Sequence, residues 1–413
     1  MFAAIKFFSC LAFIGLSIDA FAQEPKTCPV LDSAEAIIQC ALIRHPDVNV
    51  NEAMLIESIK FESLARQYPN PELDTRATYG KYLGDNMANV EMNLGFILQL
   101  GGKRNARIQR AWAEQAASRA GMLQTKEAVY IGTLSTLIRL RQLASEIDAM
   151  DHALNAFGTI QNLYRAYGRL SPEQQISMNI FQLAQGDYRA KKTMAVMEQQ
   201  RYLRSLGLSL GQAIKASPKI YPAPLKTWPV IEFSHELKGS AIQLAEADIK
   251  RSQAELKSAQ GESWPTLKLG PSIEQQTEGP FTYHTVGFNL TFDIPVFNLN
   301  QGGRAYANAG LNRAKANLHA QTTKLLTEKE ILIAQYNSVI ESLKSFPSVE
   351  SIEQKHQGAE GYFRRGLLST SLMVEYHRQI VDFIMAQNEL ELAAIDAMWK
   401  IRAMEGKLIG NTK

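Results

Sequence analysis

The sequence predicts a mainly α-helical fold that also contains β strands and is built from two similar halves. Three observations carry this prediction. Short motifs recur in the same order about 200 residues apart. Helical patterns run for tens of residues without proline. Two segments alternate apolar and polar residues, as strands with one apolar face do.

The N-terminus has the pattern of a secretory signal peptide. Lys6 precedes the apolar run Phe7–Ile18, which ends in the small-residue segment Asp19-Ala20-Phe21-Ala22. We therefore expect residues 1–22 to be a signal peptide and residues 23–32 to be an N-terminal tail. A buried N-terminal helix is the alternative.

Three cysteines are present. Cys10 lies inside the apolar run, too early to become a lipid-anchored first residue, so we expect no N-terminal lipid. Cys28 and Cys40 remain, and in an oxidising compartment a pair this close in sequence is a candidate disulfide. Two separate buried thiols are the alternative.

The first half of the chain is expected to begin with a broken helix. Ser33 is suited to cap a helix that begins at Ala34. Pro46 interrupts this helix, which then resumes to about Gln67 and ends before Pro69.

A much longer helix follows Gly102 and runs without proline to about Tyr167, which corresponds to roughly 100 Å. A helix then returns from Pro172, a favourable first helical residue, to about Leu210. The long helix carries apolar residues spaced alternately three and four apart, the pattern of a coiled-coil seam: Leu140, Leu143, Ile147, Met150, Leu154 and Phe157.

The second half predicts helices near residues 234–261, 303–345 and 370–409. Pro347 interrupts the stretch between the last two, so we expect a broken or kinked arm there.

Three pairs of landmarks relate the halves, and a proline-rich stretch separates them. We expect a first repeat at 33–215, a linker at 216–233 and a second repeat at 234–410. The landmark pairs are Asn70-Pro71-Glu72-Leu73 with Trp264-Pro265-Thr266-Leu267, Gly101-Gly102-Lys103-Arg104 with Gln301-Gly302-Gly303-Arg304, and Gly168-Arg169-Leu170-Ser171 with Gly366-Leu367-Leu368-Ser369.

Two segments have the period of two residues that is typical of membrane-spanning strands. Weaker partner strands are expected near Leu73–Leu83 and Thr266–Gln276. The alternating apolar residues are Val90, Met92, Leu94, Phe96, Leu98 and Leu100 in one segment, and Val286, Phe288, Leu290, Phe292, Ile294 and Val296 in the other.

The number of strands predicts an assembly. A closed spanning barrel needs at least about eight strands, and open strand edges are not tolerated in lipid. Four strands per chain must therefore be completed by other copies, and three copies supply twelve. The alternative is a soluble sheet with one face buried on helices.

Three motifs of this chain resemble the TolC-like outer-membrane efflux family. Residues 65–73 (ARQYPNPEL) are similar to the family's entry into its first strand. Residues 100–108 (LGGKRNARI) are similar to the turn from strand to long helix in the CzcC-like, heavy-metal branch. Residues 293–298 (DIPVFN), followed by Gln301-Gly302-Gly303-Arg304, are similar to the matching turn of the second repeat.

The resemblance implies a homotrimer. Each chain gives four strands to a trimeric 12-stranded outer-membrane β-barrel, and its helices form a long periplasmic tunnel. The implied partners are outer-membrane lipid, a periplasmic adaptor (membrane fusion protein) and an inner-membrane efflux pump, with the RND type favoured. The implied cargo is metal cations, with drugs, toxic organics or type I secreted proteins as alternatives.

The resemblance also implies site residues. The two turns between long helices would be the docking surface for the adaptor: Gly168, Arg169, Leu170, Ser171, Gly366, Leu367, Leu368 and Ser369. Glu375 would belong to a ring of carboxylates at the tunnel gate, with a solvated surface glutamate as the alternative. The chain departs from the family at Leu372, a position that is often acidic there, and at Pro347.

Other classes of function find little support. A net charge of +3 does not favour a nucleic-acid partner. The seven histidines are scattered, so we expect no metal site, no cofactor and no catalytic residues. Gly101-Gly102-Lys103-Arg104 lacks the spacing of a phosphate loop. The competing class is a periplasmic coiled-coil scaffold or adaptor; an enzyme is a third.

Overall fold

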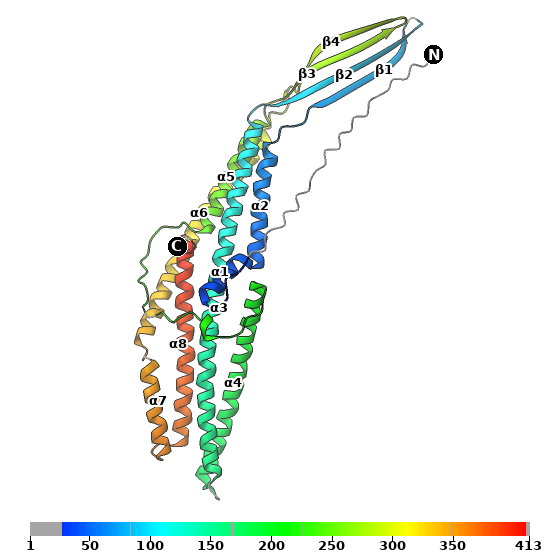
Figure 1. Cartoon of the computed structure of the whole chain (residues 1–413). Helices are drawn as coiled ribbons and strands as arrows, with labels where there is room; N and C mark the ends of the chain where they lie inside the picture. Colours follow the sequence, from blue (N-terminus) through cyan, green and yellow to red (C-terminus); the bar gives the residue numbers. More distant parts are fainter. Residues whose placement is uncertain (1–26, 83, 167–168, 226, 348, 410–413) are drawn as a thin grey trace, which may run out of the picture.

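The computed structural model describes residues 27–82, 84–166, 169–225, 227–347 and 349–409. A four-stranded sheet stands at one end of a long helical shaft (Figure 1). The predicted signal peptide and part of the predicted tail lie outside the described residues.

The first two helices are α1 (Ala34–Arg44) and α2 (Pro46–Arg66). The Ser33 hydroxyl accepts a hydrogen bond from the amide of Ala36, which caps α1 as the sequence predicts. Pro46 is the first residue of α2, where its missing N–H costs nothing.

The strands β1 (Glu72–Tyr82) and β2 (Asp85–Gln99) follow, and then the 63-residue helix α3 (Lys103–Arg165). Gly101 makes the turn into α3 with φ of 68°, and a Cβ at this position would overlap the Trp264 side chain. The helix α4 (Pro172–Leu210) begins with a capping box in which Ser171 and Gln174 bond reciprocally.

The second half contains α5 (Ser240–Gly261), β3 (Thr266–Glu278), β4 (Phe281–Phe292), α6 (Gln301–Ser345), α7 (Val349–Arg364) and α8 (Thr370–Met404). A 3₁₀ turn, η1 (Pro218–Ile220), lies in the predicted linker. The expected break near Pro347 is present, because α6 and α7 are separate helices on either side of it.

Three sequence-based boundaries were wrong. The last helix, expected to run to residue 409, ends at Met404, just before Gly406 adopts a left-handed φ of 70°. The helix expected from residue 234 begins at Ser240, because the preceding segment bonds to other helices: the amide of Gly239 donates to the carbonyl of Met404, and the buried ammonium of Lys329 donates to the carbonyl of Ser234. The strand expected to reach Val296 ends at Phe292, and Pro295 has no N–H for the ladder.

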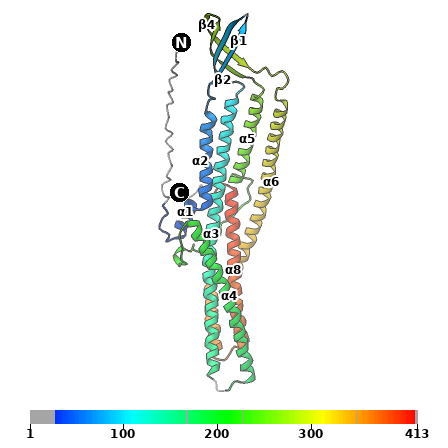
Figure 2. The same cartoon turned by 90° about the vertical axis from the view of Figure 1, so that its right-hand side faces the viewer.

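The shaft is made of helices that pack against one another along their length. Helices α2, α3, α5 and α6 lie nearest the sheet, whereas α3, α4, α7 and α8 reach the far end (Figures 1 and 2). Within the described part of the chain, no helix has a stretch long and apolar enough to cross a membrane.

The predicted coiled-coil seam of α3 lies in the interior. Leu140 belongs to a core that α1, α3, α4 and η1 share. Leu143, Met150 and Phe157 are fully buried in a second core with residues of α4 and α8, and Ile147 and Leu154 pack against it. The seam therefore holds α3 to its neighbours over much of the shaft.

Candidate functional site

One face of the sheet is apolar and open to solvent in the single chain. All neighbouring strands pair antiparallel in the order β1-β2-β3-β4, and the register places Phe96, Leu269 and Leu290 side by side across three strands. The sheet extends beyond the ends of the helices (Figure 1). The large apolar side chains that are exposed on this face are Leu73, Tyr79, Val90, Met92, Phe96, Leu98, Ile273, Val286, Phe288, Leu290 and Phe292.

The opposite face is polar. The Asn89 amide donates to the Glu274 carboxylate at 2.7 Å, across β2 and β3. The Lys268 ammonium donates to Glu72 at 2.6 Å, which links β3 to β1 over β2. The two faces of one sheet therefore differ sharply in chemistry, and helices cover neither of them (Figure 1).

The sheet also has two open edges. Among the described residues, β1 and β4 each pair with one strand only, and they have 11 and 12 residues. Each edge presents a row of unpaired backbone N–H and C=O groups along its length, which is a template for another strand.

The fold has close counterparts among solved structures. The outer-membrane channel OprN aligns with a TM-score of 0.74 at 17% identity, over 91% of this chain and 90% of that one. CusC, whose structures concern folding and transmembrane channel formation, aligns with a TM-score of 0.71 at 15% identity, over 94% and 95%. The CmeC outer-membrane channel of Campylobacter jejuni aligns with a TM-score of 0.70 at 14% identity, over 95% and 92%.

This chain has the fold of outer-membrane channels. No protein-family model matches it, and no curated protein matches it in sequence. The structural likeness therefore establishes the fold, and the function is argued below from the residues.

The two turns predicted to dock an adaptor lie together at the end of the shaft far from the sheet (Figure 1). Gly168 is outside the described residues; Ser171 caps α4 and Leu170 is half-buried. In the second turn, Gly366 adopts φ of 75° and ends α7, Leu367 is 67% exposed, and Ser369 caps α8.

Glu375 lies on the first turns of α8 and is paired. Its carboxylate accepts hydrogen bonds from Arg378 at 2.6 Å and from Gln379 at 2.8 Å. These bonds, Arg378 first, lower the pKa of Glu375 to about 2. Arg378 also contacts Asp382 at 3.3 Å. At the position that is often acidic in the family, Leu372 is 52% exposed.

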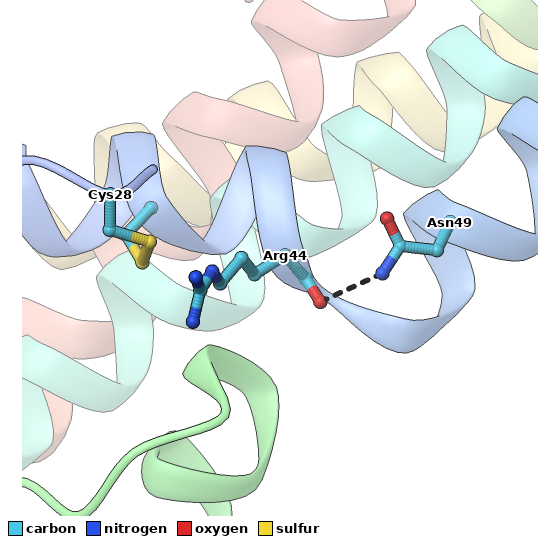
Figure 3. The surroundings of a disulfide bond; sticks show 4 residues. Cys28, Arg44 and Asn49 are labelled. Atoms are coloured by element: carbon cyan, nitrogen blue, oxygen red, sulfur yellow. Dashed lines mark hydrogen bonds between the residues drawn. A yellow bond between two sulfur atoms is a disulfide. The ribbon is translucent and has the colours of Figure 1, made fainter. Parts of the chain in front are cut away.

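Cys28 forms a disulfide with Cys40 of α1 (Figure 3), and α1 lies about midway along the shaft (Figure 1). Cys40 is fully buried on α1. One turn further on, the Asn49 side chain donates to the carbonyl of Arg44 where α1 gives way to α2 (Figure 3). The disulfide ties the start of the described chain to α1.

The structure brings together one group of side chains that the sequence analysis missed. His356 and Glu360 on α7 meet His377 on α8, and their ligand atoms all lie within 4.8 Å of one another. The expectation that the histidines do not cluster is therefore wrong for this pair. His356 and Glu360 have the i, i+4 spacing of one helix face, which was the available signal; the third member, 17 residues further on, depends on how α7 folds back on α8.

Proposed function

We propose that this chain is a subunit of a homotrimeric outer-membrane channel that serves as the exit duct of a tripartite efflux system. One observation carries the proposal: a four-stranded sheet with an exposed apolar face, a polar face and two open edges projects beyond the helical shaft. In water the apolar face would be exposed, and the unpaired N–H and C=O groups of the edges would be open to pairing with other chains. In a closed barrel, lipid covers the apolar face and neighbouring strands pair the edges.

Closure requires β1 of one copy to pair with β4 of the next. Three copies then give twelve strands, with the apolar face toward lipid and the polar face toward the lumen. The strands have 11, 15, 13 and 12 residues, and a tilted spanning strand needs about 9–11. They are therefore long enough to span the apolar layer.

The remaining parts of the chain have matching roles in this proposal. Residues 1–22 direct secretion, the repeats at 33–215 and 234–410 are joined by the linker at 216–233, and the helices of three copies enclose a periplasmic tunnel. The tip turns dock a periplasmic adaptor, which connects to an inner-membrane pump of the RND type. The resemblance of residues 100–108 to the heavy-metal branch favours metal cations as cargo; drugs, toxic organics and exported proteins are the second candidates.

A pair of arginine substitutions on one strand tests the lipid-facing side. Leu290 is on the apolar face, and its neighbour Asn289 is on the polar face. Leu290→Arg should destabilise the barrel by about 2–4 kcal/mol, because a charge near the membrane midplane loses its hydration. Asn289→Arg should be tolerated. Membrane fractionation, followed by cross-linking of the assembled trimer, gives the amount of membrane-inserted trimer for each of the two variants.

The same experiment distinguishes the proposed channel from the competing class of periplasmic coiled-coil proteins. A periplasmic scaffold or adaptor would remain in the soluble fraction, and both arginine variants would behave like the wild type. A soluble monomer, or equal tolerance at Leu290 and Asn289, would contradict the proposed barrel.

A further inference from the structure

We propose that His356, Glu360 and His377 form a binding site for one divalent transition-metal ion, of which zinc is the model, and that this ion joins α7 to α8. The Nε2 atoms of the two histidines are 3.1 Å apart. The His356 Nε2 atom is 3.7 Å from Glu360 Oε1. Two imidazoles and one carboxylate are the ligand types of many three-ligand zinc sites, in which the fourth position is left to water.

The spacing of the ligand atoms suits a small cation. Zinc binds imidazole nitrogen at about 2.0–2.1 Å and carboxylate oxygen at about 2.0–2.2 Å, so two ligand atoms of a tetrahedral site lie roughly 3.3 Å apart. The observed 3.1 Å and 3.7 Å bracket this value. All three ligand atoms lie within 4.8 Å of one another, so shifts of about 1–1.5 Å would let them surround one ion.

The side chains are oriented by further contacts, as metal ligands usually are. The Nδ1 atom of His377 is 2.9 Å from the carbonyl oxygen of Met373, so it carries the proton and leaves the Nε2 lone pair free for a metal. Glu360 accepts a bond from Arg364 at Oε2, which leaves Oε1 facing the histidines. The His356 ring stacks on Tyr376.

The site is both sheltered and reachable. His377 is 3% exposed and packs edge-on against Phe157 of α3. Glu360 lies on the wall of a pocket of about 540 Å³ that opens between α3, α7 and α8. Arg364 and Met373, which orient two of the ligands, line the same pocket. The pocket gives solvent access to the Glu360 side of the site, and burial of the His377 imidazole limits the competition from water there.

The site also lies where α7 has few other contacts that hold it to α8. No described side chain of α7 is fully buried, and Pro347 separates α7 from α6. Among the described side chains of α7, Phe363 packs against the core that α3, α4 and α8 share, so apolar packing attaches α7 at its C-terminal end. An ion held by two residues of α7 and one of α8 would fix these helices just above the turn at Gly366–Ser369.

The simpler alternative is a hydrogen bond between two neutral imidazoles, with no ion. A direct hydrogen bond also explains the 3.1 Å between the Nε2 atoms of His356 and His377, but it gives Glu360 no part in holding the two rings together. Removal of the Glu360 charge therefore distinguishes the two cases: it should weaken an ion site and leave a histidine pair intact.

Metal binding to the purified full chain in detergent tests the proposal. After chelator treatment, equilibrium dialysis against Zn(II) should give one ion per chain, and Mg(II) should not bind. Glu360→Gln and His356→Ala should each weaken zinc binding by at least about 10-fold. Both positions are partly exposed, and circular dichroism checks that the variants fold.

The chain offers a matched control. His152 Nε2 lies 3.7 Å from Asp148 on one face of α3, the same spacing as His356 and Glu360, but both side chains are more than 70% exposed, and among the described residues no third ligand joins them. His152→Ala should leave the stoichiometry and affinity unchanged. Zinc binding that His152→Ala reduces and Glu360→Gln does not would overturn the proposal, as would no bound zinc at neutral pH.

Two further measurements test the ligands and the role. X-ray absorption at the zinc edge should show two imidazole nitrogens at about 2.0–2.1 Å. Zinc should slow hydrogen exchange in residues 349–364 of the wild type and not in Glu360→Gln. Equal exchange with and without zinc would exclude an ion that joins α7 to α8. The site belongs to a single chain, so it can fail while the channel proposal stands, and the reverse holds as well.

Discussion

The last third of α3 and the whole of α7 each lead into a tip turn, yet they are held in different ways. The end of α3 continues an unbroken helix and buries Met150, Ala153 and Phe157. Helix α7 is cut off by Pro347, and none of its described side chains is fully buried. One arm is fixed by apolar burial, and the other depends on rings and polar contacts with α8.

The difference predicts different mechanical behaviour. Buried apolar contacts cannot be exchanged for water without cost, whereas exposed polar contacts can. The α3–α4 arm should therefore behave as a rigid support. Without a bound metal ion, the arm that contains α7 should be adjustable, which would let this end of the proposed channel change shape.

The largest effect is expected at the turns themselves. If the proposed docking is right, Leu367→Asp and Leu170→Asp should each abolish efflux while the trimer still assembles, because a charge would replace an apolar side chain on the proposed docking surface. Leu367→Met should retain efflux. Substrate accumulation in cells, measured beside trimer content of the membrane, provides the readout. Transport that survives both aspartate variants would place docking elsewhere.

Truncation of a ring tests the rigid arm. Phe157 is fully buried against Phe181, Tyr188 and His377, so Phe157→Ala should cost about 3–5 kcal/mol. Tyr362 on α7 is 51% exposed, and Tyr362→Ala should cost less than about 1 kcal/mol. Opening free energies from hydrogen exchange in each arm give the two values. Similar losses in both arms would remove the contrast between them.

Ion pairs test the same difference between the α3–α4 arm and the arm that contains α7, with a smaller expected change in stability. Arg139 bonds the buried Glu146 at 2.7 Å and also Glu198. Arg139→Gln should cost about 2–3 kcal/mol, since the buried Glu146 loses its cationic partner and, among the described residues, keeps the bond from Asn388. Arg364→Gln on α7, where Arg364 is 77% exposed, should cost at most about 1 kcal/mol. Chemical denaturation of the two variants would compare them, and equal midpoints would count against a buried network.

Local signals in the sequence predicted most of the fold. Ser33, Pro46 and Pro172 begin helices where capping and proline rules place them. The alternating segments became β2 and β4, and their partner strands were placed within a few residues. These features depend on near neighbours in the chain, so composition and spacing suffice to find them.

The errors came from contacts between distant residues. The extended segment before Ser240 is held by the end of α8, and no local pattern announces that contact. His356 and His377 meet because α7 folds back on α8 after Gly366. The pairing of Glu375 with Arg378 could have been predicted from the sequence, because the two residues have i, i+3 spacing on one predicted helix.

The smallest effect on stability is expected at Glu375, where the pH dependence has a definite sign. Its bonds to Arg378 and Gln379 lower its pKa to about 2. A lowered pKa stabilises the fold above the ordinary carboxyl pKa of 4.5, and this contribution is lost as the pH falls toward about 2. Glu375 should therefore stay ionised from pH 7 to pH 5. Because the pair is exposed, Glu375→Gln should hardly change the thermal midpoint at pH 7.

Its effect on conduction is the functional test of the gate. If three copies bring Glu375 together around the tunnel axis, Glu375→Gln should weaken cation preference and relieve block by divalent cations applied from the tunnel side. Arg378 neutralises part of this charge, so Arg378→Gln should strengthen both properties. Planar-bilayer recording measures the reversal potential and the block. Wild-type values should be constant between pH 7 and pH 5. If neither substitution moves the reversal potential or the block, Glu375 is a surface residue outside the gate.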